Sequence, residues 1–408
     1  MREGWFIKKL GEICNFQGGS QPPKSQFISE DREEYVRFLQ IRDFKSDKHI
    51  VYIPASSKNR LCNETDIMIG RYGASVGQIL RGKAGAYNVA LIKTIPNEKI
   101  IDRNFFFFYL NSSLFQKPLT SVSDRSAQAG FNKEDISSFD IPLPPLPEQK
   151  QIVAILDEAF EGIDRAIANA EKNLDNSREL FESYLNAIFT QKGDGWEKKK
   201  LGDIATFRNG LNFTKSSKGE SIKIVGVKDF QNHFWIQEAE LDSVTIDANL
   251  KEIDILRKGD ILTVRSNGNK ELIGRCLLAN ELSEKTSHSG FTIRIRIEKE
   301  DIYPQFIVHY LKSKELRKQL AESGGGISIS SLNQQGLSLI IINFPTFLKQ
   351  KAIVANIDEI AFETQRLEAI YRQKLVALNE LKQSILQKAF TGELTANTPK
   401  TIKEELAA

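Results

Sequence analysis

The chain has 408 residues, of which 40% are hydrophobic and 27% are charged, so it can bury sizeable cores and is expected to form two or more domains. No run of about 18 apolar residues occurs, which argues against a transmembrane helix. The net charge of +3 is too small for a chain that binds polyanions through bulk charge alone. The charged N-terminus and three widely spaced cysteines without a CxxC pair predict a reducing, cytoplasmic location.

The first block, residues 1–146, is predicted to be a β-rich domain. Short β-branched runs at residues 67–69 and 90–92 are typical of strands, and a helix is expected near residues 104–119. The aromatic run at residues 105–109 is interpreted as the core face of that helix rather than as a platform for stacked bases. A proline-rich segment at residues 141–147 is expected to be extended and to end the block.

A long helix is predicted over residues 147–191. Its apolar residues recur in steps of three, four or seven from Ile152 to Ile188, which favours a coiled coil. Such a helix would measure roughly 60–66 Å at about 1.5 Å per residue, so it cannot bury its apolar stripe within one block. We expect it to pair antiparallel with a second helix over residues 346–392; pairing with another protein is the alternative.

The two helices belong to an internal duplication. The segment WFIKKLGEI at residues 5–13 recurs as WEKKKLGDI at residues 196–204. Three further segments recur in the same order: Arg42–Phe44 as Lys228–Phe230, Asp66–Met68 as Asp260–Leu262, and Tyr109–Leu110 as Tyr310–Leu311. A period of about 200 residues indicates a duplicated domain and not a solenoid. It predicts a second domain at residues 192–345, the helix at 346–392 and a tail at 393–408.

The predicted fold is therefore α+β. It has two tandem domains of mixed α/β, β-rich structure, separated and joined by two long antiparallel helices that form a coiled coil, with an internal pseudo-two-fold repeat. The second helix ends in Phe390-Thr391-Gly392, much as the first ends in Phe189-Thr190 before the Trp196 segment. Residues 391–395 are accordingly expected close to residues 4–10.

The sequence lacks the usual equipment for catalysis. A methyltransferase needs a glycine-rich cofactor loop and an Asn/Asp-Pro-Pro-aromatic motif, and an ATPase needs a P-loop; none of these motifs occurs. The four histidines show no paired metal spacing, so surface or packing roles are expected for them. The chain is predicted not to be an enzyme and to hold no metal or cofactor.

Several motifs in combination resemble the specificity subunits of type I restriction–modification systems. They are the segment Pro142–Gln149 before the first helix, Gly195-Trp196 with Lys200–Ile204, and the ending Leu386–Leu394. The resemblance extends over residues 1–395. The second half departs from the pattern at residues 343–346 and at Lys349, where the first half has Glu148.

The resemblance implies that the two domains are target-recognition domains, each of which reads one half of a bipartite, gapped double-stranded DNA site. It implies that the helices hold the domains apart and dock two methyltransferase subunits, and that restriction (translocase) subunits join this core. S-adenosylmethionine, ATP and Mg²⁺ would then be bound by the partner subunits. A helix of the predicted length would limit the distance between the centres of the two domains to roughly 19 base pairs. A coiled-coil scaffold without a DNA role is the alternative.

Residues that contact DNA are expected in polar loops that occupy equivalent places in the two repeats but differ in sequence. Lysine and arginine suit phosphates, whereas arginine, asparagine, glutamine, serine and aromatic side chains suit base edges. A turn-capping arginine and solvated loops are the competing interpretations. The candidates are Lys24, Arg42, Lys45, Arg71, Tyr72, Ser75, Arg125, Gln128, Asn132, Lys215, Lys218, Lys228, Asn232, Arg265, Ser266, Asn267, Asn269, Lys270, Ser328, Ser330 and Asn333.

Overall fold

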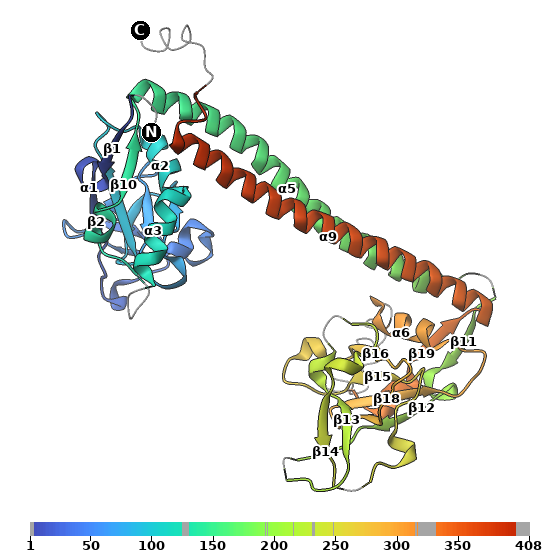
Figure 1. Cartoon of the computed structure of the whole chain (residues 1–408). Helices are drawn as coiled ribbons and strands as arrows, with labels where there is room; N and C mark the ends of the chain where they lie inside the picture. The colour runs from blue at the N-terminus through green and yellow to red at the C-terminus, as the bar shows by residue number, and fades with distance from the viewer. Residues whose placement is uncertain are drawn as a thin grey trace. The chain divides into compact units, whose positions relative to one another are not determined.

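The computed structural model describes residues 4–124, 130–191, 193, 195–214, 216–230, 233–247, 249–314, 316 and 332–396. The chain divides into two compact units: unit 1 comprises Met1–Glu171 and Gln373–Ala408, and unit 2 comprises Lys172–Arg372. Each unit contains one β-rich domain and parts of the long helices α5 (Leu146–Thr190) and α9 (Phe347–Thr391) (Figure 1).

The domain of unit 1 is built on three small sheets. A four-stranded sheet has the order β2 (Cys14–Gly18), β9 (Leu91–Pro96), β6 (Met68–Gly70) and β7 (Ile79–Leu80). A second sheet has the order β4 (Tyr52–Pro54), β3 (Tyr35–Leu39), β8 (Gly85–Tyr87) and β5 (Leu61–Cys62). A two-stranded ribbon pairs β1 (Phe6–Lys9) with β10 (Asp140–Leu143). The short helices α1 (Leu10–Ile13) and α4 (Lys133–Ser137) accompany this ribbon.

Unit 2 repeats this arrangement, except that no strand among its described residues corresponds to β5. Its four-stranded sheet has the order β12 (Ala205–Asn209), β18 (Thr292–Ile297), β15 (Ile261–Val264) and β16 (Cys276–Leu278). A three-stranded sheet has the order β14 (Asp242–Thr245), β13 (Ser221–Val225) and β17 (Thr286–His288), and β11 (Glu197–Lys200) pairs with β19 (Ile341–Phe344). The parallel pair β13–β17 corresponds to the parallel pair β3–β8. The predicted duplication and the tandem α+β fold are confirmed.

One pair of glycines shows why the repeat preserves particular residues. Gly19 and Gly210 directly follow the first strand of the four-stranded sheet in each unit, and their backbone N–H groups donate to the carbonyls of Leu91 and Thr292. A Cβ on Gly19 would lie 2.0 Å from the carbonyl oxygen of Asn88, and one on Gly210 would lie 2.2 Å from that of Ser289. Only glycine allows two backbone segments to approach so closely.

The helix expected at residues 104–119 is two helices, so this prediction was wrong in detail. Helix α2 (Arg103–Asn111) ends at Ser112, whose hydroxyl donates to the carbonyl of Tyr109 at 2.7 Å, and α3 (Ser113–Ser123) follows. In unit 2, α6 (Pro304–Lys312) ends in the same way at Ser313, whose hydroxyl lies 2.6 Å from Tyr310 O. A side chain that bonds the preceding turn competes with continuation of the helix. The aromatic run does form the core, as predicted, because Phe105, Phe106 and Tyr109 are fully buried.

A buried glutamine fixes the start of each long helix. The amide oxygen of Gln149 accepts from Asp102 N at 2.7 Å, and its nitrogen donates to Ile100 O and Pro144 O. Gln350 makes the same three bonds in unit 2, from Tyr303 N and to Asp301 O and Pro345 O. The backbone geometry therefore persists in the second half, although its proline-rich segment is shortened to one proline.

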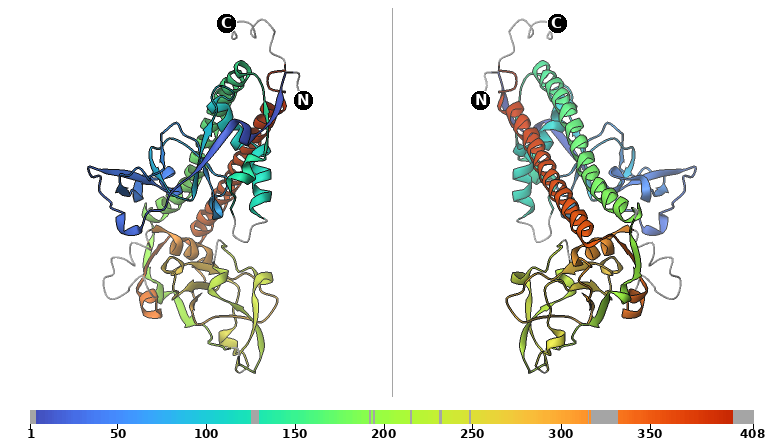
Figure 2. Two further views of the ribbon diagram at one scale, coloured as in Figure 1. Left: turned by 90° about the vertical axis from the view of Figure 1, so that its left-hand side faces the viewer. Right: turned by 90° about the vertical axis from the view of Figure 1, so that its right-hand side faces the viewer.

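The long helices lie side by side and antiparallel within each unit (Figures 1 and 2). In unit 1, Lys382 of α9 pairs with Asp164 of α5. In unit 2, Arg178 of α5 lies 3.2 Å from Glu368 of α9, and this contact lowers the pKa of that carboxyl. The predicted antiparallel pairing is confirmed, and α5 and α9 each extend over 45 residues.

Each domain core is completed by the last turn of one long helix. In unit 1, the ring of Phe390 lies 5.1 Å from Phe105 and 5.7 Å from Tyr109, both at steep angles. In unit 2, Phe189 contacts Phe306 and Tyr310 at 5.4 and 5.1 Å. Edge-to-face pairs of this kind add to the free energy gained by burial. The helices are therefore integral parts of the two domains.

The predicted approach of residues 391–395 to residues 4–10 is also present in unit 1. The indole N–H of Trp5 donates to Glu148 at 3.2 Å, and the hydroxyl of Thr395 donates to the other oxygen of the same carboxylate at 2.7 Å. Leu394 packs against the core cluster that contains Trp5 and Leu10. Among the described residues, no helix is long and apolar enough to cross a membrane.

Candidate nucleic-acid interface

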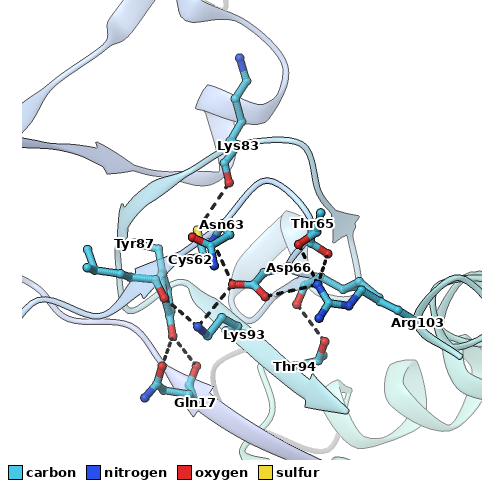
Figure 3. A network of polar contacts seen from close by, with 12 residues as sticks. Gln17, Cys62, Asn63, Thr65, Asp66, Lys83, Tyr87, Lys93, Thr94 and Arg103 are labelled. Atoms are coloured by element: carbon cyan, nitrogen blue, oxygen red, sulfur yellow. Dashed lines mark hydrogen bonds and ion pairs between the residues drawn. The ribbon is translucent and has the colours of Figure 1, made fainter. Parts of the chain in front are cut away.

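A polar network links the turn before β6 to its neighbours in unit 1 (Figure 3). Asp66, just before β6, accepts from Asn63 N at 2.9 Å and from Lys93 Nζ at 3.4 Å. Arg103 at the start of α2 donates to the carbonyl and hydroxyl of Thr65 in the same turn. These bonds tie the turn before β6 to both β9 and α2, which fixes the base of the loop that follows β6.

Unit 2 uses the repeated aspartate in the same way. Asp260 accepts from Arg257 N at 2.7 Å, as Asp66 accepts from Asn63. Its two carboxylate oxygens also accept hydrogen bonds from Nε and Nη2 of Arg296, each at 2.7 Å. This bidentate contact raises the pKa of Arg296. The aspartates that recur in the sequence thus build turns.

The two candidate arginines occupy equivalent backbone positions after these strands. The backbone N–H of Arg71 donates to Ala90 O at 2.8 Å, and that of Arg265 donates to Phe291 O at 2.9 Å. The side chain of Arg71 donates through Nε to Phe131 O and lies 4.9 Å from the centre of the Tyr72 ring. Arg71 therefore has a structural bond through one nitrogen, while Tyr72 beside it is exposed. Contact with DNA at Arg71 and Arg265 stays a prediction.

Two candidate asparagines hold local turns. Asn132 accepts from Asp135 N at 2.8 Å at the start of α4, and Asn333 accepts from Gly336 N at 2.7 Å at the start of α8 (Gln334–Leu339). These are N-cap bonds, and asparagine is among the best residues for that position. Their equivalence reflects the common scaffold, and a role of either side chain in DNA contact is still a prediction.

The remaining candidates are distributed over exposed or half-exposed loops. Lys228 is paired with Asp242 at 2.6 Å, and this carboxylate raises the pKa of the lysine. Asn269 lies in a turn in which its backbone N–H donates to Asn267 at 2.8 Å. The other exposed or half-exposed candidates are Lys24, Arg42, Lys45, Ser75, Lys218 and Ser266. Arg125, Gln128, Lys215, Asn232, Ser328 and Ser330, and the side chain of Lys270, lie outside the described residues.

Residues from three candidate loop regions of unit 2 line one cavity of about 400 Å³. Its lining includes Phe213 from residues 212–218, Lys228 from residues 228–232, and Asn267 from residues 265–270. Phe291, which is 62% exposed, also lines it. Phe291 was not among the predicted contact residues because it begins a strand-like run. Phe291 corresponds to Ala90 of unit 1, because each accepts the backbone bond of a candidate arginine. A comparison of the two repeats at this position would have identified Phe291.

Comparison with known proteins agrees with this duplicated scaffold. Residues 2–173 and residues 193–374 each match the family described as the type I restriction modification DNA specificity domain. The chain belongs to this family.

Similar proteins of the specificity-domain family match nearly the whole chain. This chain is 25% identical to the type I restriction enzyme StySPI specificity subunit of Salmonella potsdam and 26% identical to the EcoKI specificity subunit of Escherichia coli. Each alignment covers 97% of this chain and 90% of the relative.

Two solved structures share the fold. One is a chain from a structure that describes complex assembly and conformational transition of the type I R-M system, with a TM-score of 0.76. This match has 20% identity and covers 96% of this chain and 99% of that one. The other is the HsdS subunit of Thermoanaerobacter tengcongensis, with a TM-score of 0.58 and 20% identity over 97% and 98% of the two chains.

Cys14, Cys62 and His288 are buried in the specificity-domain scaffold. Burial raises the pKa of the Cys14 thiol to about 12 and that of Cys62 to about 11, so both are neutral thiols near pH 7. His288 is buried and contacts the Thr292 hydroxyl at 2.9 Å. In the part of the chain that the structure describes, no group of three or more histidine, cysteine or acidic residues could hold a metal ion.

Proposed function

We propose that this chain is the sequence-specific DNA-recognition subunit of a type I restriction–modification complex, and that each domain reads one half of a bipartite, gapped site. The observation that carries this proposal is that the specificity-domain family matches twice, once over each repeat. A duplicated reader on one chain suits a target with two half-sites.

The contrast between scaffold and loops supports a different half-site for each domain. The glycines and glutamines that fix the backbone have the same bonds in both units, and the two aspartates accept the same backbone bond. The side chains beside the equivalent arginines differ: Tyr72 is exposed in unit 1, and Phe291 is exposed in unit 2. Two interfaces of different chemistry on one scaffold would select different bases.

We propose that α5 and α9 set the spacing between the half-sites and dock two methyltransferase subunits, which restriction subunits then join. Apolar side chains on the exposed side of α9 in unit 2, such as Leu348 and Phe362, support a docking role. Helices that complete both domain cores would keep such a spacing constant.

The chemistry would belong to the partners. We propose that this chain is non-catalytic, and that S-adenosylmethionine, ATP and Mg²⁺ are bound by the methyltransferase and restriction subunits. The complex would act in the cytoplasm, where the DNA of the host lies.

Methylome sequencing of a host that expresses the chain with its methyltransferase partner tests the proposal. A gapped motif with two unlike halves is expected, and methylation that is absent or lacks a gap would contradict it. Gel shifts of the assembled complex with random DNA separate the proposal from the scaffold alternative. A scaffold would leave the affinity of the methyltransferase for DNA and its sequence choice unchanged.

A further inference from the structure

The cavity of unit 2 has a character that the loop sequences alone do not show. Phe213, Val244 and Phe291 give it apolar walls, and Asn267, Lys228 and Asp242 lie among them. Phe213 and Val244 also pack against the buried residues Ile222, Ile224 and Ile246, so this wall is supported from behind. Phe291 has no such cover and exposes 62% of its surface. Isolated exposed apolar residues are common, but this one borders a built cavity.

The backbone holds Phe291 firmly at this place. Gly290 N donates to Leu211 O at 2.7 Å, and Leu211 N donates to His288 O at 2.8 Å. The carbonyl of Phe291 itself accepts from Arg265 N. The exposed ring is therefore attached to a segment bonded on both sides, directly beside a predicted DNA-contact loop.

The charges at the cavity favour a base edge over a phosphate. Lys228 is neutralised by Asp242 at 2.6 Å, so the pair offers no net positive charge, and the carboxylate would repel a phosphate. The amide oxygen of Asn267 accepts from Asn269 N at 2.8 Å, which directs the amide nitrogen to act as the donor. The site thus combines an apolar surface and a neutral hydrogen-bond donor with an ion pair that has no net charge.

We infer that this cavity reads a thymine in the half-site of the second domain, with Phe291 against the 5-methyl group and the Asn267 amide nitrogen donating to O4. In the major groove, thymine is the base that presents an acceptor next to a methyl group. This inference rests on the proposed function. Unit 1 has Ala90 at the place of Phe291, so its domain would read bases by other contacts.

The first test removes only the methyl group. The complex of the chain with its methyltransferase partner is bound to its methylome-derived site, in which each thymine of both half-sites and both strands is replaced in turn by deoxyuridine. At one thymine of one half-site, the wild-type complex should bind the deoxyuridine-containing site roughly fourfold more weakly than the thymine-containing site, as the loss of one buried methyl group predicts. Phe291→Ala should bind the two bases equally there, and Phe291→Leu should keep at least half of the discrimination.

Ile253→Ala is the matched control, because Ile253 is 52% exposed in the same unit but does not line the cavity. This variant should keep the wild-type ratio. The inference is overturned if no thymine shows a methyl effect, if the half-sites contain no thymine, or if Phe291→Ala keeps the full ratio. Each of these results would leave a gapped motif intact, whereas failure of the proposed function would show as no gapped motif.

A second substitution tests the hydrogen bond. Replacing the same thymine by 5-methylcytosine, paired with guanine, keeps the methyl group but puts an amino donor where O4 accepts. Wild type should discriminate against 5-methylcytosine at least tenfold, and Asn267→Ala should lose most of that discrimination while it keeps the deoxyuridine effect. Equal discrimination in wild type and Asn267→Ala would overturn the role of Asn267.

Discussion

The domains of units 1 and 2 differ most where they expose side chains and least where they bond their backbones. Tyr87 in β8 and His288 in β17 accept the same backbone bond, from Ser20 and Leu211 respectively. Beside the equivalent arginines, by contrast, Phe291 replaces Ala90 and Ser266 replaces Tyr72. The comparison indicates that duplication preserved a frame of glycine, aspartate and glutamine bonds and left the surface it supports free to diverge.

The largest effect should come from the helix ends that complete both domains. Phe390→Ala should lower the free energy of unfolding of unit 1 by about 3–5 kcal/mol, and Phe189→Ala should do the same to unit 2, because each leaves a cavity among aromatic rings. Denaturant unfolding followed by hydrogen exchange can assign each loss to its unit. The exposed Phe362→Ala is the control. A loss below about 1 kcal/mol for either buried ring would show that the domains fold without these helices.

Alanine variants of the two equivalent arginines should affect different half-sites. If Arg71 and Arg265 read bases, each alanine variant should weaken binding of the assembled complex by about 1–3 kcal/mol and relax selectivity in one half-site only. Binding to a library randomised in one half-site at a time measures this. Two variants that relax the same half-site would break the assignment of one domain to each.

Acid should destabilise the two domains unequally. Burial lowers the pKa of His288 to about 3, whereas unfolding returns it to its ordinary value of 6.5. The folded state therefore binds fewer protons below pH 6.5, and stability is lost as the pH falls from 6.5 toward 3, by about 2 kcal/mol at pH 5. The residue of unit 1 at the place of His288 is Tyr87. Burial raises the pKa of Tyr87, so its hydroxyl stays neutral throughout this pH range.

Hydrogen exchange at pH 7 and pH 5 checks the acid effect, with β8 of unit 1 as the internal reference for β17 of unit 2. His288→Gln should reduce the acid sensitivity of unit 2. Equal loss of protection in both strands of the wild type would contradict the prediction.

The smallest effect is expected at single exposed lysines. If Lys218 contacts a phosphate, Lys218→Ala should weaken binding to all sequences alike, by less than about 1 kcal/mol. The slope of log affinity against log salt concentration should become shallower by about 0.9. A change in sequence preference with an unaltered salt slope would instead make Lys218 a base contact.

The repeat allowed much of this architecture to be predicted from the sequence. Apolar residues that recur at regular spacing, such as those from Ile152 to Ile188 in α5, are enough to predict a long helix. The matching segments indicate two copies of one domain. The break at Ser112 was missed because it depends on one hydroxyl bond, which no periodicity reports. The role of Gln149 was missed because its three partners come from segments as far as 49 residues away.

The candidate site was less predictable because it also depends on contacts between segments that are far apart in the sequence. Polar loops can be recognised as exposed, but the cavity needs Phe213, Asn267 and Phe291 to be brought together by three separate turns. The ion pair of Lys228 with Asp242 also depends on the tertiary structure, whereas the bond from Asp135 N to Asn132 is a local helix cap. They show that some polar residues at equivalent positions first stabilise the loops that carry them.

The central claim, that each repeat reads its own half-site, is tested most directly by methylome sequencing of a chain with one domain duplicated. Residues 197–344 would be replaced by residues 6–143, since β1–β10 and β11–β19 pair in the same register. The account predicts a gapped motif whose two halves are copies of the half-site read by the first domain. A motif that keeps the two unlike halves of the wild type would contradict it.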